Sequence, residues 1–172
     1  MKKEGTLKLK KGGLDTIIAY IVVMLPLFYV LVYMIATIYH FSVQQYMNQV
    51  VKEACIMAST YGGVTTKHTD YIYGKLEKIA SNKKKVRDEF SVSYYVRSFD
   101  YGSGVVSKDL VPATGIPDVK KGDIIGIYVQ SRDPSLLGTV GNFNVFMFGR
   151  GKTDLLKYTA YREEIIRNER NQ

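Results

Sequence analysis

Cysteine, histidine and tryptophan are almost absent from this sequence, and each shortage excludes a class of site. The 172 residues include one cysteine, Cys55, two histidines, His40 and His68, and no tryptophan. A single cysteine cannot form an intramolecular disulfide, so the fold has to be stabilised by its own packing. Two histidines so far apart in the chain argue against a multi-histidine metal site. We therefore assign no metal ligands and no metal.

The sequence also lacks the short motifs that mark common catalytic and cofactor sites. It contains no HExxH, Gly-x-Ser-x-Gly, Walker A or Cys-x-x-Cys pattern. Gly102-Ser103-Gly104 has neither the third glycine nor the strand-to-helix context of a nucleotide-binding loop, and it predicts a hairpin turn instead. We expect a protein that is not an enzyme, with no catalytic residue and no cofactor.

A dense basic surface is largely missing as well, although the formal net charge is +8. The cluster Lys83-Lys84-Lys85-Val86-Arg87 follows the polar pair Ser81-Asn82, which favours a solvated loop over a binding patch. A second excess of positive charge lies at the N-terminus, where five lysines stand against Glu4 and Asp15. We expect no nucleic-acid partner.

The longest feature of the chain is a run without acidic or basic residues except His40, over residues 17–41 (IIAYIVVMLPLFYVLVYMIATIYHF). A helix of 25 residues is roughly 37 Å long, which exceeds the ~30 Å hydrocarbon core of a bilayer. The run therefore predicts one transmembrane helix. Pro26 lies near its middle and predicts a kink, because proline removes a backbone hydrogen bond and clashes with the preceding turn.

Several features predict that this helix is a signal anchor at the cell membrane. Its apolar core is longer than that of a secretory signal peptide, and no small-x-small cleavage site follows it. Lysines concentrated before the helix predict a cytoplasmic N-terminus. Residues 1–16 are then a cytoplasmic basic tail or a leader, and residues 62–172 form an extracytoplasmic, β-rich domain. His40 is interpreted as an interfacial residue and not as a ligand.

The helical pattern continues beyond the apolar run, over residues 42–61, and the helix becomes amphipathic there. Polar residues fill one face, and Gly62-Gly63 predicts the end of the helix. Cys55 is interpreted as a small packing residue on this helix. A stripe of apolar residues at spacings of three and four predicts a packing surface against the following domain or other subunits: Val43, Met47, Val50, Ala54 and Met57.

The rest of the chain predicts a small antiparallel sheet, so that the fold class is α+β. Residues 90–96, 124–129 and 143–148 combine alternation with β-branched and bulky side chains, as strands do. Turn residues separate these runs. A weaker helical pattern covers residues 69–81. Residues 155–170 favour a strand with a polar tail, although a fraying helix also fits the last residues.

The block from Lys10 to Val64 resembles the N-terminal region of TadE-like pilus assembly proteins, including a clostridial group of relatives. The resemblance rests on the basic residues, on Gly12-Gly13, on Leu25-Pro26 within a long apolar helix, and on the polar helix that ends in Tyr61-Gly62-Gly63. It covers about a third of the chain. A short strand-rich domain follows, as in that family.

The resemblance implies a minor, pilin-like (pseudopilin) subunit of a Tad-type pilus or secretion machine. It implies cleavage of a leader after Gly13, which makes Leu14 the new N-terminus. Its partners would be the lipid bilayer and other pilin-like or pilus-assembly subunits, in homo- or hetero-oligomers formed through the N-terminal helix. The alternative is a single-pass anchored binding or sensor module, adhesin-like and non-enzymatic, in which the helix is only a tether.

Overall fold

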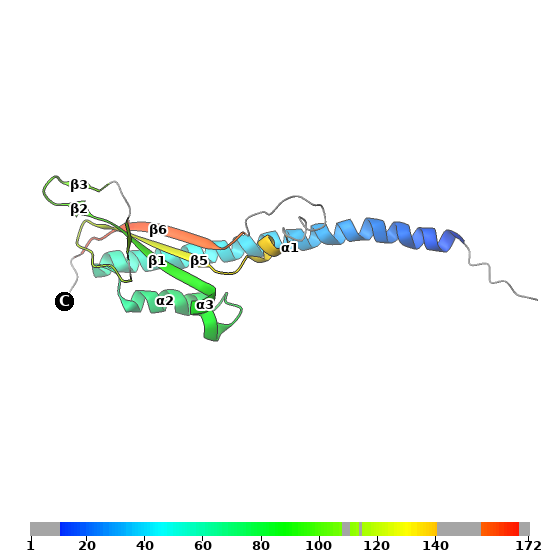
Figure 1. Cartoon of the computed structure of the whole chain (residues 1–172), viewed down its shortest axis with the longest axis horizontal. Helices are drawn as coiled ribbons and strands as arrows, with labels where there is room; N and C mark the ends of the chain where they lie inside the picture. Colours follow the sequence, from blue (N-terminus) through cyan, green and yellow to red (C-terminus); the bar gives the residue numbers. More distant parts are fainter. Residues whose placement is uncertain (1–10, 108–110, 114, 141–155, 169–172) are drawn as a thin grey trace, which may run out of the picture.

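A long helix and a small α+β domain make up the parts of the chain that the computed structural model describes, which are residues 11–107, 111–113, 115–140 and 156–168. The helix, α1 (Lys11–Tyr61), extends far beyond the domain at its N-terminal end (Figure 1). The remaining elements are, in chain order, α2 (Thr66–Leu76), η1 (Lys83–Lys85), α3 (Val86–Glu89), β1 (Phe90–Arg97), β2 (Phe99–Asp100), β3 (Val105–Val106), β4 (Val111–Ala113), β5 (Ile124–Ser131) and β6 (Thr159–Ile165).

Four strands form one antiparallel sheet in the order β4-β1-β5-β6. Strands β1 and β5 are paired along their whole length, from Phe90 opposite Ser131 to Arg97 opposite Ile124. Strand β6 pairs with the other side of β5 and is therefore an edge strand. The short strands β2 and β3 form a separate hairpin at the end of the domain farthest from the N-terminus (Figure 1).

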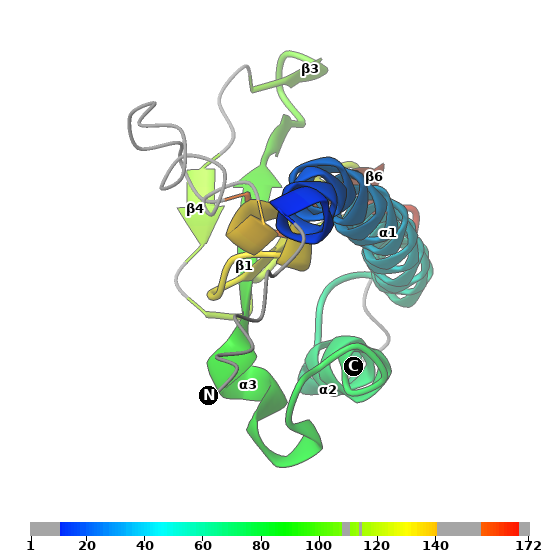
Figure 2. The same cartoon turned by 90° about the vertical axis from the view of Figure 1, so that its right-hand side faces the viewer.

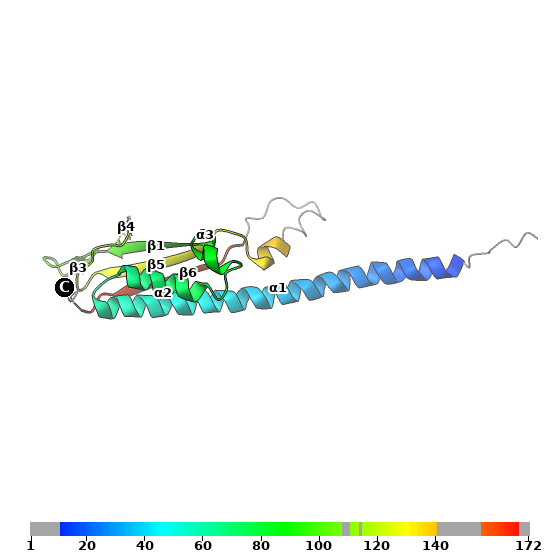
Figure 3. The same cartoon turned by 90° about the horizontal axis from the view of Figure 1, so that it is seen from below.

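Helices α1 and α2 lie on the same side of this sheet, and the hydrophobic core lies between the three (Figures 2 and 3). The core forms because alternate residues of β1 and β5 point inward and meet apolar side chains of both helices. Its largest fully buried side chains include Met47 of α1, Ile72 and Leu76 of α2, and Ile125 and Ile127 of β5, and Phe90 and Tyr94 of β1 are also buried in this core.

The α+β class predicted from the sequence is confirmed, with one unbroken helix followed by a small antiparallel sheet. Predicted strands 90–96 and 124–129 correspond to β1 and β5, and the C-terminal strand is β6. The turn predicted at Gly102-Ser103-Gly104 joins β2 to β3. The predicted helix over 69–81 is α2, which begins and ends earlier, at Thr66 and Leu76. The strand predicted at 143–148 lies outside the described residues.

The lysine cluster at residues 83–85 is not the loop that the sequence predicted. It forms a turn of 3₁₀-helix followed by α3, and Val86 is buried there. The turn is stabilised at its start, because Asn82 Oδ1 accepts a hydrogen bond from the Lys84 backbone N–H at 3.0 Å. The three lysine side chains are exposed, as a solvated segment requires.

Two glycines end α1 and turn the chain back toward α2. Gly62 and Gly63 have φ angles of 83° and 141°, in the region that side chains with a Cβ rarely adopt. The Gly63 N–H donates to the Ala58 carbonyl at 2.8 Å, which satisfies one of the last carbonyls of the helix. This turn places α2 beside the second half of α1.

Candidate membrane-spanning helix and its packing surface

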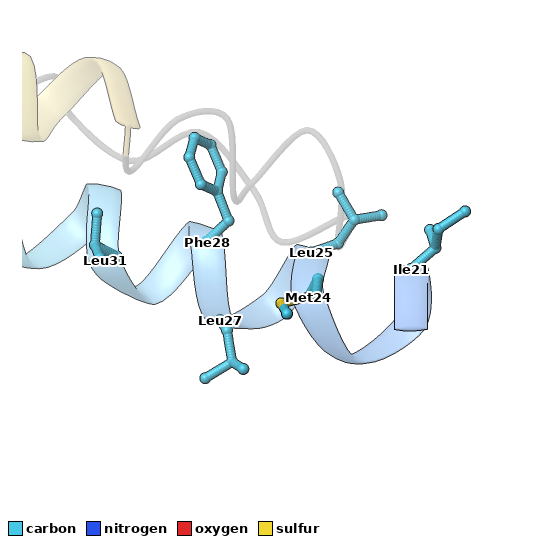
Figure 4. Close-up of a pocket in the computed structure, with 6 residues that line it drawn as sticks. All are labelled: Ile21, Met24, Leu25, Leu27, Phe28 and Leu31. Carbon is cyan, nitrogen blue, oxygen red and sulfur yellow. The ribbon is translucent and has the colours of Figure 1, made fainter. Parts of the chain in front are cut away.

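Most apolar side chains in the N-terminal half of α1 are exposed, although Tyr29 and Val32 are half-buried. Between Ile17 and Ile35 the exposed large apolar side chains have exposed fractions from 43% at Tyr33 to 67% at Phe28. Figure 4 shows a shallow hollow lined by six of these side chains, in which Leu27 and Phe28 point to opposite sides of the helix. All six of these residues are apolar, so this part of the lining offers no polar side chain to orient a ligand.

This half of α1 has the length and composition of a membrane span. Among the described residues, one helix is long and apolar enough to cross a bilayer, and it is α1. The part that carries no domain, residues 17–35, is roughly 28 Å long at 1.5 Å per residue, which is close to the ~30 Å hydrocarbon thickness.

The domain begins to contact α1 earlier than residue 41, where the sequence placed the end of the apolar span. Ala36 is only 1% exposed, and the His40 ring is stacked on the Tyr158 ring, with 5.1 Å between ring centroids. A small side chain and a flat ring allow the domain to approach α1 closely at these positions. The last part of the predicted span therefore lies against protein, and its interfacial histidine packs on an aromatic ring.

The second half of α1 buries most of the predicted apolar stripe. Val43, Met47, Val50 and Ala54 are buried, whereas Met57 is only half-buried. The buried face is also wider than the predicted stripe and extends to Val51, Cys55, Ala58 and Ser59. The reason is that α1 lies between two neighbours, with α2 on one flank and β6 on the other (Figure 1).

On the β6 flank, polar side chains of α1 satisfy backbone groups of the edge strand. The Gln44 side-chain amide donates to the Thr159 carbonyl, and the Gln44 carbonyl accepts from the Thr159 N–H at 3.3 Å. At the other end of the strand, the Ser59 hydroxyl donates to the Ile165 carbonyl. A sheet edge is a template for unwanted pairing, and a helix that covers it removes that hazard.

On the α2 flank, Glu53 and two tyrosines join the helices. The Tyr71 hydroxyl donates to Glu53 at 2.5 Å, and the Gln49 amide donates to the other carboxylate oxygen at 2.9 Å. These hydrogen bonds lower the pKa of Glu53 below its usual value. The Tyr46 hydroxyl donates to the Lys75 carbonyl at 3.0 Å. These contacts fix α2 against α1.

Cys55 lies on the buried face and has the chemistry of a packing residue. Burial raises the pKa of its thiol to about 12, so the thiol stays protonated at neutral pH. The thiol donates weakly to the Arg162 carbonyl at 3.3 Å. A protonated, buried thiol is a poor nucleophile.

The residues proposed for processing and for the kink all lie within α1. Gly13 and Leu14 are in its first turn, and the helix continues through Pro26. Within the described part of the chain, no group of three or more His, Cys, Asp or Glu side chains is arranged to hold a metal ion.

Sequence patterns missed one buried carboxylate that organises the far end of the domain. Asp123 accepts hydrogen bonds from the Phe99 N–H and the Lys120 N–H, both at 2.7 Å. Its backbone carbonyl accepts from the Ile166 N–H at 2.8 Å. The position of Asp123 directly after Lys121-Gly122, at the start of a β-branched run, is the turn signal that could have indicated it.

A cluster of tyrosines on the outer face of the sheet was also missed. Tyr161 lies over Gly126, because a Cβ at that position would come within 2.8 Å of the Tyr161 hydroxyl. The Tyr161 ring contacts Tyr95 and Tyr128, with ring centroids 6.2 Å and 6.5 Å apart. The three residues come from β1, β5 and β6, and only the strand register brings them together.

No protein-family model, curated protein or solved structure matches this chain. Inferences about function therefore rest on α1 and on the surfaces around it.

Proposed function

We propose that this chain is a membrane-anchored, pilin-like (TadE-like) structural or assembly subunit of a Tad-type pilus or secretion machine. The observation that supports the proposal is that the two halves of α1 differ in their exposure. Its first half is apolar and mostly exposed, and its second half packs along a small domain. In this proposal the N-terminus is cytoplasmic and the domain lies outside the membrane.

The exposed half of α1 requires an apolar environment. A helix that is apolar all round is stable in a bilayer or among other helices, whereas in water it would expose far more contiguous apolar surface than a soluble monomer carries. A pilin-like subunit uses both environments, since its helix lies in the membrane before assembly and against neighbouring helices afterwards. This dual use supports the proposal.

Contacts between subunits would then involve the first half of α1. The apolar face of the second half is already covered by the chain's own domain. Its exposed face is largely polar and includes Gln45, Asn48, Gln49 and Lys52. Helix-to-helix packing in an assembly is therefore expected between residues 17 and 35, where a kink at Pro26 would shape the contact.

Cysteine crosslinking in native membranes tests the proposal. Single cysteines placed in turn from Val22 to Val30 should form disulfide-linked dimers or adducts with other subunits, with maxima every three or four residues. Gln49→Cys, on the polar face, should form none. A simple tether predicts no periodic crosslinks between Val22 and Val30, and that result would refute the assembly role.

Two further measurements test the topology and the processing. A cysteine at the exposed Ser93 should react with a membrane-impermeant thiol reagent in intact cells, whereas one at Thr6 should not; the reverse pattern would overturn the orientation. Mass spectrometry of the membrane-extracted protein distinguishes a mature chain that starts at Leu14 from an uncleaved anchor.

The second candidate function is an anchored binding or sensor module. It is favoured by the cluster of Tyr95, Tyr128 and Tyr161 on the outer face of the sheet, in which Tyr161 is exposed and the other two are half-buried, because accessible aromatic side chains are typical of recognition surfaces. The crosslinking experiment separates the two functions, since a module of this kind needs no contact between neighbouring α1 helices.

A further inference from the structure

The end of the domain nearest the exposed half of α1 carries features that neither the core nor the span explains. At this end β1 begins, β5 ends and β6 begins, with Phe90 opposite Ser131 and Gln130 opposite Thr159. A short helical segment, residues 136–140, lies here beside α1 (Figures 1 and 3). We call this end the basal surface and define it by two leucines, Leu136 and Leu156, and five cationic residues, Lys83, Lys84, Lys85, Arg132 and Lys157.

The two leucines lie next to the outer end of the apolar span. Leu136 is 46% exposed and Leu156 is 52% exposed. The Ser135 N–H donates to the Leu156 carbonyl at 2.7 Å, which holds the two segments together. Two residues after Leu156 in sequence, the Tyr158 ring is stacked on His40 of α1. Both leucines therefore extend the apolar surface of α1 sideways from the level of His40.

At this same level, α1 itself exposes further large apolar side chains. Ile38, Tyr39 and Phe41 are all exposed, although the domain already covers another side of the helix there. Two separate parts of the chain thus expose apolar groups at one height along α1. A domain surrounded by water does not need such a band of apolar side chains, whereas a domain that touches the membrane interface does.

All five cationic residues are exposed, and Lys157 directly follows Leu156 in sequence. The Arg132 N–H donates to the Glu89 carbonyl at 2.7 Å, which joins the segment that leads to Leu136 to the end of α3. The Glu89 carboxylate accepts from the Ser81 and Asn82 N–H groups, both at 2.7 Å, and so holds the start of the lysine turn close by.

Acidic groups at this end do not cancel the positive charge. Asp88 and Asp133 are exposed here, and Glu89 is engaged with the Ser81 and Asn82 backbone. Arg87 is not counted as part of the surface, because it pairs with Asp70 at 2.7 Å. Among the described residues, five cationic side chains against these three carboxylates leave the basal surface positive.

We propose that the basal surface binds anionic lipid headgroups, with Leu136 and Leu156 inserted into the membrane interface and the lysines and arginine on the phosphates. Apolar side chains flanked by cations are the combination that binds an anionic bilayer surface. The proposal rests on the proposed membrane span of α1. Its consequence is that the domain is held against the bilayer instead of standing free on its helix.

Fluorescence quenching in vesicles tests the basal surface. The full-length chain carrying Leu136→Cys is labelled with an environment-sensitive fluorophore and reconstituted into phosphatidylcholine vesicles with or without phosphatidylglycerol, both containing lipid-borne nitroxide quencher. The buried Cys55 thiol, whose pKa is raised to about 12, does not compete for the label. Phe28→Cys reports on the span, and Val105→Cys reports on the β2–β3 hairpin at the far end.

The label at residue 136 should be quenched several-fold more than the label at residue 105, and more strongly when phosphatidylglycerol is present. Replacing Lys83, Lys84 and Lys85 by glutamate should abolish the dependence on phosphatidylglycerol. The matched control is Lys120→Glu with Lys121→Glu at the far end, which should leave that dependence unchanged.

The possible failures are distinguishable. If the label at residue 28 is quenched but the label at residue 136 is not, the membrane span is supported and the proposed lipid binding of the basal surface is refuted. If the lysine replacements and the control behave alike, the assignment of the lysines to headgroups is wrong. If residue 28 is not quenched and the chain does not float with the vesicles, the membrane span itself is refuted, and the basal surface with it.

Discussion

The two halves of α1 form one continuous helix but differ in which side chains they expose and bury. Up to Ile35, most apolar side chains of the helix are exposed, whereas Tyr29 and Val32 are half-buried. From Val43 onward, it buries one broad face and exposes polar residues on the other. The difference indicates that amphipathicity is needed only where the two sides of a helix meet different environments.

The largest expected effect comes from placing a charge in the buried half. Val50→Asp puts a carboxyl group into the core, where it has to be protonated to avoid an unpaired charge. Neutralising a carboxyl of pKa 3.9 at pH 7 costs about 4 kcal/mol, so the domain should lose about that much free energy of unfolding. Thermal melting of the full chain in detergent measures it.

The matched control is Asn48→Asp, two residues earlier on the exposed face, which should cost less than about 0.5 kcal/mol. Equal destabilisation by the two substitutions would show that the buried and exposed faces of α1 are wrongly assigned.

A charge in the exposed half should have the opposite pattern of effects. Val30→Asp should leave the melting temperature of the domain unchanged, because Val30 is exposed, but it should weaken membrane insertion by about 3 kcal/mol. Membrane fractionation and carbonate extraction measure insertion. A lower melting temperature with normal insertion would contradict the division of α1.

A smaller effect is expected where α1 joins the sheet edge. Gln44→Ala removes the partner of both the N–H and the carbonyl of Thr159 and should destabilise the domain by about 1–2 kcal/mol. Gln45→Ala, exposed on the next position, should be neutral. Hydrogen exchange at the start of β6 should accelerate for Gln44→Ala alone; unchanged exchange would show that α1 does not protect this edge.

The smallest effect concerns pH and the helix that flanks the buried half. His68 Nδ1 accepts from the Thr65 N–H at 3.0 Å, and the ring packs against Tyr61. Burial lowers the pKa of His68, so the folded state favours the neutral ring. The unfolded chain therefore takes up the proton first, and stability should be greatest above pH 6.5 and fall as the pH decreases below it.

Denaturant unfolding between pH 8 and pH 5 measures this dependence. His68→Gln keeps a polar side chain at the position but cannot titrate, so the part of the slope due to this residue should disappear. An identical slope in the two proteins would assign the pH dependence to other groups.

Local patterns in the sequence predicted the elements whose signal repeats over many residues. The apolar run and its amphipathic continuation gave α1, and the alternation in 90–96 and 124–129 gave β1 and β5. The short elements were not predicted. Strand β4 has three residues, one of them Pro112, and it exists because it pairs with residues 94–96 of β1. Pairing of this kind depends on tertiary structure.

The same limit explains why the buried face of α1 is wider than the predicted stripe, four of whose five residues are buried. The predicted stripe from Val43 to Met57 followed apolar side chains alone. The actual face turns toward Cys55 and Ser59, because β6 lies there and its backbone needs polar partners. A polar serine on a buried face cannot be recognised from periodicity, since its partner is about a hundred residues away in sequence.

Coverage of the β6 edge by α1 also has a mechanical consequence. Gln44 and Ser59 are fifteen residues apart, roughly 22 Å along a helix, and they bond to Thr159 and Ile165, roughly 20 Å apart along a strand. The bonded positions therefore have nearly the same spacing on the helix and on the strand, and the two elements run side by side. A force that pulls the domain along the axis of α1 loads all of these bonds, and the β5–β6 ladder beyond them, in shear and at the same time. Bonds loaded together resist rupture better than bonds peeled one by one, so this joint is suited to transmit tension along the helix.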